Sequence, residues 1–151
     1  MSVLATLTSI RRLYFDTAPL IYYTEGHPEY LPTLRVIMEQ IAPDRIHGIT
    51  SVLTLTETLM KPLQHQQSAL VQQYRTLFYQ TAALTTVPIT APIAELAATL
   101  RAQYRLRTPD ALQVATAIDA GCDAFLTNDF ALQRITEIAV LVVADLANHA
   151  P

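Results

Sequence analysis

The sequence predicts a single α/β domain in which a central parallel sheet of four to five strands lies between two layers of helices. Short apolar runs typical of strands alternate along the chain with longer segments of helical spacing, and this alternation gives a parallel sheet with helices on both faces. The 151 residues are enough for one domain with a substantial core and too few for two. We therefore treat residues 1–151 as one unit.

The first third of the chain predicts two strands with helices between them. Residues 11–17 (RRLYFDT) are an apolar run ending in Asp16 and form the expected first strand. Pro19 suits the first turn of a helix that closes at Gly26. Residues 45–52 return to a strand. The helix between them has apolar side chains at helical spacing, at Leu31, Leu34, Ile37, Met38 and Ile41.

The rest of the chain continues the alternation. Two helices come first, and a short strand over residues 84–90 ends in Thr90, which can cap the helix that follows it. Helical segments are expected over residues 53–63, 68–83, 91–106, 109–121 and 130–135, and further strands over residues 124–127 and 139–145.

The composition is that of a compact globular protein. Hydrophobic residues make up 51% of the chain and charged residues 15%, so disorder is not indicated. The net charge of −3 excludes a coat protein that covers nucleic acid through many cationic contacts. It is compatible with an enzyme that approaches nucleic acid through a bound cation. The scarcity of charge also indicates a partly apolar surface for a partner or a second copy.

The compartment is indicated by the single cysteine and the amino-terminal segment. Cys122 alone cannot form an internal disulfide or a cysteine-rich zinc site, which fits a reducing cytoplasm. The arginines of the opening segment follow its apolar residues, the reverse of a signal peptide. No uncharged run is long enough for a membrane span. We therefore expect a soluble cytoplasmic protein.

Four carboxylates stand where a parallel α/β fold displays its chemistry, near the carboxyl ends of strands. Asp16 ends the first strand and Asp129 follows the fourth. Asp110 opens the helix before the fourth strand, and Glu57 lies in the helix after the second. Because crossovers in such sheets are right-handed, the carboxyl ends of the strands share one edge. The four acids are therefore expected to converge on one cleft.

Three of these acids also have a purely structural interpretation. Asp110 could complement the dipole of its helix, and Asp129 could cap the short helical piece after it. Asp16 could be a turn acid, although apolar neighbours on both sides disfavour that. Each position is therefore compatible with a structural and with a functional role.

Glu57 is the least expected acid, because it is the only charged residue between Arg45 and Lys61. An ionised carboxylate buried in such surroundings needs a partner or a metal. Carboxylates gathered in one pocket raise one another's pKa unless cations are present. Oxygen ligands alone favour Mg²⁺ or Mn²⁺ over zinc, and the four histidines show no metal-ligand spacing. The expected chemistry is metal-assisted hydrolysis of a phosphodiester.

The order of the motifs YFDTAPLIYY, TLTETL and RTPDALQVATAIDAGCDAFLTND resembles the PIN domain, and within it the VapC-type toxins of bacterial toxin–antitoxin modules. The resemblance covers nearly the whole chain and is most specific in the last motif. It implies a magnesium- or manganese-dependent endoribonuclease that cleaves single-stranded RNA. It also implies a homodimer and inhibition by a small antitoxin protein. The implied site residues are the acids Asp16, Glu57, Asp110 and Asp129, with Thr127 as the hydroxyl that orients an acid or a water.

Two features depart from the family's pattern. Many relatives have a second acid shortly after the last motif, where Phe130 and Ala131 stand here, so a second metal ion would be weakly held. Basic residues are few, with Lys61 as the only lysine. The candidates for contacts to RNA phosphates are the arginines just before the third acid, which otherwise form a solvated helix face: Arg101, Arg105 and Arg107.

Two other functions fit parts of the sequence. A haloacid dehalogenase-type phosphatase also places an Asp after its first strand, but it needs a second Asp at the position of Ala18 and a lysine in the second half of the chain. A non-catalytic PIN-like module that binds RNA or protein is the other alternative, although clustered carboxylates without use would cost stability. Both a toxin and a housekeeping nuclease are compatible with the motifs.

Overall fold

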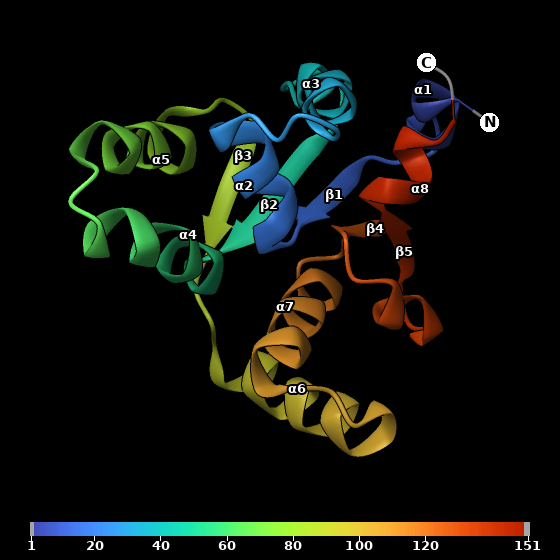
Figure 1. Ribbon diagram of the computed structural model, residues 1–151. Helices are drawn as coiled ribbons and strands as arrows, with labels where there is room; N and C mark the ends of the chain where they lie inside the picture. The colour runs from blue at the N-terminus through green and yellow to red at the C-terminus, as the bar shows by residue number, and fades with distance from the viewer. Residues whose placement is uncertain (1, 150–151) are drawn as a thin grey trace.

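The central sheet of the computed structural model, which describes residues 2–149, has five parallel strands in the order β3-β2-β1-β4-β5 (Figure 1). The prediction of a parallel α/β fold with four to five strands is confirmed. The strands are β1 (Arg12–Phe15), β2 (His47–Ser51), β3 (Leu84–Val87), β4 (Ala124–Thr127) and β5 (Ala139–Val142). The helices are α1 (Val3–Leu7), α2 (Thr17–Glu25), α3 (Leu31–Glu39), α4 (Val52–Gln64), α5 (Ser68–Gln80), α6 (Ala91–Tyr104), α7 (Thr108–Asp119) and α8 (Val143–Ala147), with the 3₁₀ helix η1 (Phe130–Arg134).

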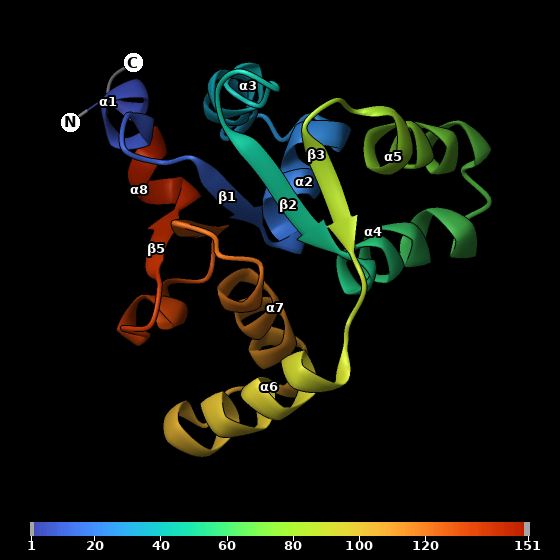
Figure 2. The same cartoon turned by 180° about the vertical axis from the view of Figure 1, so that it is seen from behind.

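Side chains on the two faces of the sheet enter two separate cores. Leu13 and Phe15 of β1 point into one core and Tyr14 into the other, as the two-residue period of a strand requires. Helices α1, α2, α3, α5 and α8 contribute to the first core, and α6 and α7 to the second. Figures 1 and 2 show α6 and α7 side by side on their own face of the sheet. Tyr14 stacks on Phe125 of β4 with ring centroids 5.4 Å apart.

Several helix ends follow the local signals in the sequence. The side chain of Asp16 accepts a hydrogen bond from the amide of Thr17 and caps α2, and Gly26 ends that helix with a φ of 73°. Such a positive φ suits glycine because it has no Cβ. The predicted cap of α6 is confirmed, since the Thr90 side chain accepts from the amide of Ile93.

Two short helices were not predicted from the sequence. Helix α1 begins after Ser2, whose side chain accepts from the amide of Ala5. The final strand, expected over residues 139–145, ends at Val142 and continues as α8. Asn128 Oδ1 accepts from the amide of Ala144 at 3.0 Å, so a side chain from the β4 exit satisfies an amide of the first turn of α8.

The strand order places a crevice between β1 and β4. From β1 the chain builds β2 and β3 on one side and then crosses back to form β4 and β5 on the other. In open α/β sheets, ligands bind outside the carboxyl ends of the strands at such a switch point. Phe15 pairs with Leu126, and the amide of Asp16 donates to the carbonyl of Leu126 at 2.9 Å. Residues that follow β1 and β4 are therefore neighbours.

Among residues 2–149, no helix combines the length and the apolar character that a membrane crossing requires.

Candidate active site

A cleft of about 420 Å³ lies at this edge of the sheet and gathers the acids singled out in the sequence. Each comes from a different segment: Asp16 from the end of β1, Glu57 from α4, Asp110 from α7 and Asp129 from the loop after β4. Thr127 and Arg107 also line the cleft. The sheet topology thus collects residues that are up to 113 positions apart in the chain, from Asp16 to Asp129.

Asp16 is the most enclosed of the four acids, and both of its oxygens are held. Oδ1 accepts from the amide of Thr17 at 2.7 Å, and Oδ2 accepts from Thr127 Oγ1 at 2.8 Å. Burial, with smaller contributions from the charges of Asp110 and Glu57, raises the pKa of Asp16 to about 6 despite the lowering effect of the two hydrogen bonds. An ionised Asp16 is therefore costly without a nearby cation.

Thr127 connects two of the acids at the end of β4. Its buried hydroxyl donates to Asp16 and accepts from the amide of Asp129 at 3.1 Å. The Asp129 side chain in turn accepts from the amide of Ala131 at 3.0 Å and caps η1. The capping role considered for Asp129 is therefore present, and it fixes the carboxylate at the rim of the cleft.

The expectation that Glu57 is a buried charge is wrong, because its side chain is exposed. Helix α4 buries Thr54, Thr58 and Pro62, so its other faces, including apolar Met60, are open to solvent. Glu57 Oε1 accepts from Thr17 Oγ1 at 2.9 Å. Glu57 therefore faces the cleft and is hydrogen-bonded at its edge.

Of the three candidate arginines, only Arg107 lines the cleft. Its Nε donates to Asp110 Oδ2 at 3.0 Å, and its side chain is 79% exposed compared with 19% for Asp110. Arg101 Nε donates to the carbonyl of Leu106 at 2.9 Å, and Arg105 ends α6 in a left-handed conformation. Arg101 and Arg105 thus have roles in the turn between α6 and α7.

Comparison with known proteins places the chain in a family. The family model described as the PIN domain matches residues 13–138. The chain belongs to the PIN domain family. Among curated proteins, no match is found.

Solved structures with a similar fold include toxin–antitoxin complexes and a toxin. A toxin–antitoxin complex from Klebsiella pneumoniae is 24% identical, with a TM-score of 0.68, over 87% of this chain and 97% of that one. VapBC2 from Rickettsia felis, bound to a promoter DNA fragment, is 16% identical with a TM-score of 0.68, over 87% and 98%. VapC20 from Mycobacterium tuberculosis, a toxin that cleaves the sarcin-ricin loop, is 15% identical with a TM-score of 0.66, over 84% and 98%. At these identities the likeness concerns the fold.

A buried glutamine at the centre of this PIN domain was missed in the sequence. Gln113 of α7 is 1% exposed. Its Oε1 accepts from the hydroxyl of Tyr14, and its Nε2 donates to Thr54 at 2.9 Å and to Glu57 Oε1 at 3.2 Å. One amide thus connects the core of the sheet to an acid of the cleft. The signal that identifies it is a polar residue in the otherwise apolar segment ALQVA.

The donor set of this PIN domain fits a hard cation. All four side chains supply carboxylate oxygen, which Mg²⁺ and Mn²⁺ prefer. The pKa of Asp16 is raised mainly by burial and to a smaller extent by the charges of Asp110 and Glu57, and a bound cation would favour its ionised form. The side chains are spread around the cleft: within residues 2–149, no three His, Cys, Asp or Glu residues stand close enough to hold an ion together. Arg107 supplies the positive charge beside Asp110.

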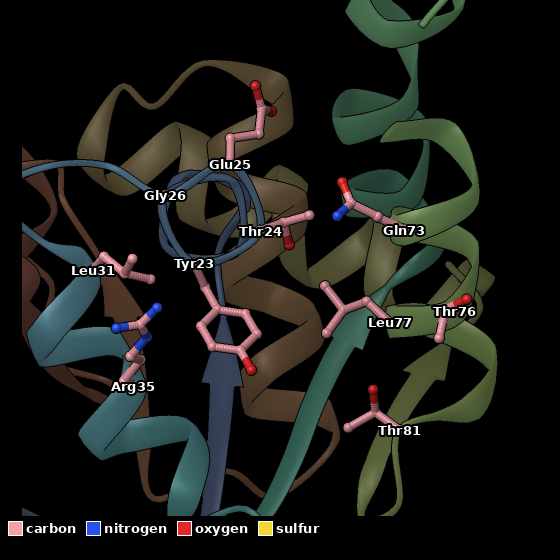
Figure 3. Close-up of a pocket in the computed structure, with 10 residues that line it drawn as sticks. All are labelled: Tyr23, Thr24, Glu25, Gly26, Leu31, Arg35, Gln73, Thr76, Leu77 and Thr81. Atoms are coloured by element: carbon pink, nitrogen blue, oxygen red, sulfur yellow. The ribbon is translucent and has the colours of Figure 1, made fainter. Parts of the chain in front are cut away.

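A second cavity, of about 500 Å³, lies between α2, α3 and α5 and is lined by none of the four acids (Figure 3). Leu31 and Leu77 form apolar parts of its wall, and Arg35 points toward it from α3. Thr24 also lines it, and Thr24 Oγ1 is buried with no hydrogen-bond partner in the described part of the chain. This cavity therefore has both apolar and polar side chains in its lining.

Proposed function

We propose that the protein is a metal-dependent endoribonuclease that hydrolyses phosphodiester bonds of single-stranded RNA, and that it acts as the toxin of a toxin–antitoxin pair. The observation that carries the proposal is the convergence of four carboxylates on one cleft at the switch point of the sheet. Membership of the PIN domain family supports it, as does the fold shared with a toxin that cleaves the sarcin-ricin loop.

The four acids, Thr127 and Arg107 each have a role in the proposed reaction. Asp16, Glu57, Asp110 and Asp129 would hold Mg²⁺ or Mn²⁺. When bound, such an ion supplies positive charge that attracts the phosphate and lowers the pKa of an attacking water. Thr127 donates to Asp16 Oδ2 and keeps that carboxylate in one orientation. Arg107 is exposed at the rim, so it can leave its ion pair with Asp110 and bind a phosphate of the RNA instead.

The clustered acids favour an enzyme over a module that only binds. Burial and the nearby charges of Asp110 and Glu57 raise the pKa of Asp16 to about 6, so its ionised form costs free energy in the folded protein. A protein that bound RNA or a partner without using these acids would gain stability by replacing them. The retained charge is explained by a reaction that needs a cation.

The test is cleavage of an end-labelled single-stranded RNA by the purified protein with Mg²⁺, with Mn²⁺ and with EDTA. We expect cleavage with either ion and none with EDTA. Asp129→Asn should reduce the rate at least about 100-fold, because even groups that only support metal ligands contribute about 10- to 100-fold. Asp119→Asn is the matched control, since Asp119 is an exposed acid of α7 that does not line the cleft. Cleavage that persists in EDTA, or equal rates for both variants, would contradict the proposal.

We further propose that the protein is a cytoplasmic homodimer inhibited by a small antitoxin. Helix α4 carries exposed apolar side chains such as Met60 and Leu63, which are 52% and 54% exposed. They support an interface on α4, because covering apolar side chains with a partner lowers the free energy of the complex. The cavity between α2, α3 and α5 offers the antitoxin a place outside the cleft. Light scattering should give a mass twice that of the chain, which is 16.7 kDa, and Leu63→Asp should reduce the measured mass to that of the monomer.

The inhibition has a separate test. Addition of the purified antitoxin should stop RNA cleavage. A monomeric wild type would refute the dimer, and full cleavage with the antitoxin present would refute the inhibition.

A further inference from the structure

We infer that the side of the cleft formed by α2 binds a nucleobase, with Tyr22 as the stacking surface. This inference rests on the proposed ribonuclease function and concerns how the RNA strand is held. Ala18, Ile21 and Tyr22 all line the cleft, and their spacing of three and four residues places them on one face of the helix. The lining of the cleft therefore includes an uncharged, partly aromatic wall beside the acids.

The Tyr22 ring is fixed in position before any ligand binds. Its hydroxyl accepts from Asn128 Nδ2 at 3.2 Å, and the other end of that amide is bonded to α8. The rings of His27 and Tyr30 pack against it in tilted orientations, with centroids 4.7 Å and 5.2 Å from that of Tyr22. A ring already packed against two other rings loses little conformational entropy when a ligand binds to it.

The wall is within reach of the reacting phosphate. Asp16 caps α2, and the six residues from Asp16 to Tyr22 rise roughly 9 Å along the helix axis. A nucleotide and its neighbour can bridge that distance, so a phosphate beside Asp16 places an adjacent base against Tyr22. The cleft volume of about 420 Å³ lies within the range of about 300–1,000 Å³ typical of small-ligand sites.

The charge of the protein explains why such a surface is needed. Most proteins bind nucleic acid through lysine and arginine contacts to phosphates, but this chain has a net charge of −3 and Arg107 is the only arginine lining the cleft. Four carboxylates at the same place repel the phosphates on either side of the cleaved bond. Stacking of a base on an aromatic ring contributes about 1–3 kcal/mol and requires no positive charge.

The experiment combines protein and RNA changes in one cycle. An RNA with a single abasic site beside the cleaved bond should raise the KM of the wild type roughly 5- to 150-fold, the fold-change equivalent to the stacking energy. Tyr22→Leu should raise the KM for intact RNA by a similar factor, and the abasic site should add nothing to that. Tyr22→Phe keeps the ring and should restore the wild-type KM. Tyr79→Leu is the control, since Tyr79 is 66% exposed on α5 and outside the cleft.

Three outcomes would overturn the inference. Additive effects of Tyr22→Leu and the abasic site on KM would show that the base is bound elsewhere. If Phe130→Ala raises the KM and Tyr22→Leu does not, the base stacks on Phe130, which is 53% exposed and follows Asp129. If the wild type cleaves no RNA, the proposed function fails, and fluorescence anisotropy of the same RNAs with Ca²⁺ makes the same comparison through binding alone. In that measurement, equal affinities of wild type and Tyr22→Leu would overturn the inference.

Discussion

Replacing Asp16 with asparagine is expected to stabilise the metal-free protein and to abolish RNA cleavage. The stabilisation follows from the pKa of Asp16, which burial and neighbouring charges raise from 3.8 to about 6. The ionised side chain therefore destabilises the folded state at neutral pH by up to roughly 3 kcal/mol. Asparagine removes that charge. Its side-chain oxygen can still accept a hydrogen bond from the Thr17 amide, and its side-chain nitrogen can donate one to the Thr127 hydroxyl. Because 1 kcal/mol shifts the melting temperature by about 2–4 °C in a domain of this size, we expect an increase of roughly 5–10 °C in EDTA.

The pH dependence has a definite direction. Because its pKa is raised in the folded state, Asp16 binds its proton more tightly there than in the unfolded chain. Its contribution to stability is greatest below about pH 4 and is lost as the pH rises through about 6. The Asp16→Asn variant lacks this loss, so the two unfolding free energies should diverge between those pH values. Urea titrations across this range measure the difference.

Metal ions should reverse the order of stability. Mg²⁺ or Mn²⁺ should raise the melting temperature of the wild type, because an ion that binds only the folded state stabilises it. It should have little effect on Asp16→Asn, which lacks one of the proposed ligands. Asp119→Asn, a change at an exposed acid, should respond to the ions as the wild type does. Equal melting temperatures of wild type and Asp16→Asn in EDTA would contradict the electrostatic explanation.

The second large effect is expected at Gln113, where Gln113→Leu should destabilise the fold by about 2–4 kcal/mol. The substitution leaves the buried hydroxyl of Tyr14 without its acceptor, and an unsatisfied buried group costs about 1–3 kcal/mol. Thr54 also loses its amide partner. Gln103→Leu is the matched control, because Gln103 lies exposed on α6. Urea denaturation of both variants measures the difference.

A double substitution separates the hydrogen-bond network from simple packing. Tyr14→Phe removes the hydroxyl group that donates to Gln113. In a protein that already carries Tyr14→Phe, Gln113→Leu should therefore lower the free energy of unfolding by less than it does in the wild type. Such non-additivity is the signature of two groups that interact directly. Gln113→Leu should also slow cleavage, because Glu57 keeps only the bond from Thr17. Strictly additive free energies would show that Gln113 acts through packing alone.

The placement of the acids could be predicted because it depends on local features and on one topological rule. Asp16 directly follows β1, Asp129 lies two residues after β4, and Asp110 lies in the first turn of α7. Each position can be read from a few neighbouring residues. Right-handed crossovers then bring the strand ends to one edge. The sheet order, with β1 between β2 and β4, has this arrangement.

Features that depend on distant contacts could not be predicted. The exposure of Glu57 depends on which face of α4 packs on the sheet. The hydrogen bond to the first turn of α8 and the support of Tyr22 both come from Asn128, a residue more than one hundred positions from Tyr22 in the chain. Arg101 was a candidate for a phosphate contact, but its Nε donates to the carbonyl of Leu106 in the turn after α6. In these cases the missing information was the three-dimensional path of the chain.

The pairing of β1 with β4 has a consequence for the stage of synthesis at which the cleft is completed. Strand β1 lies between β2, which is near residue 50 of the chain, and β4, which is near residue 125. The ribosome adds about 5–20 residues each second and amino-terminal segments leave it first, so β1 waits for one of its two neighbours until most of the chain exists. Until then Asp16 lacks Thr127, and Asp129, which follows β4, has not yet been made. A chain that ends before β4 therefore cannot form the complete cleft.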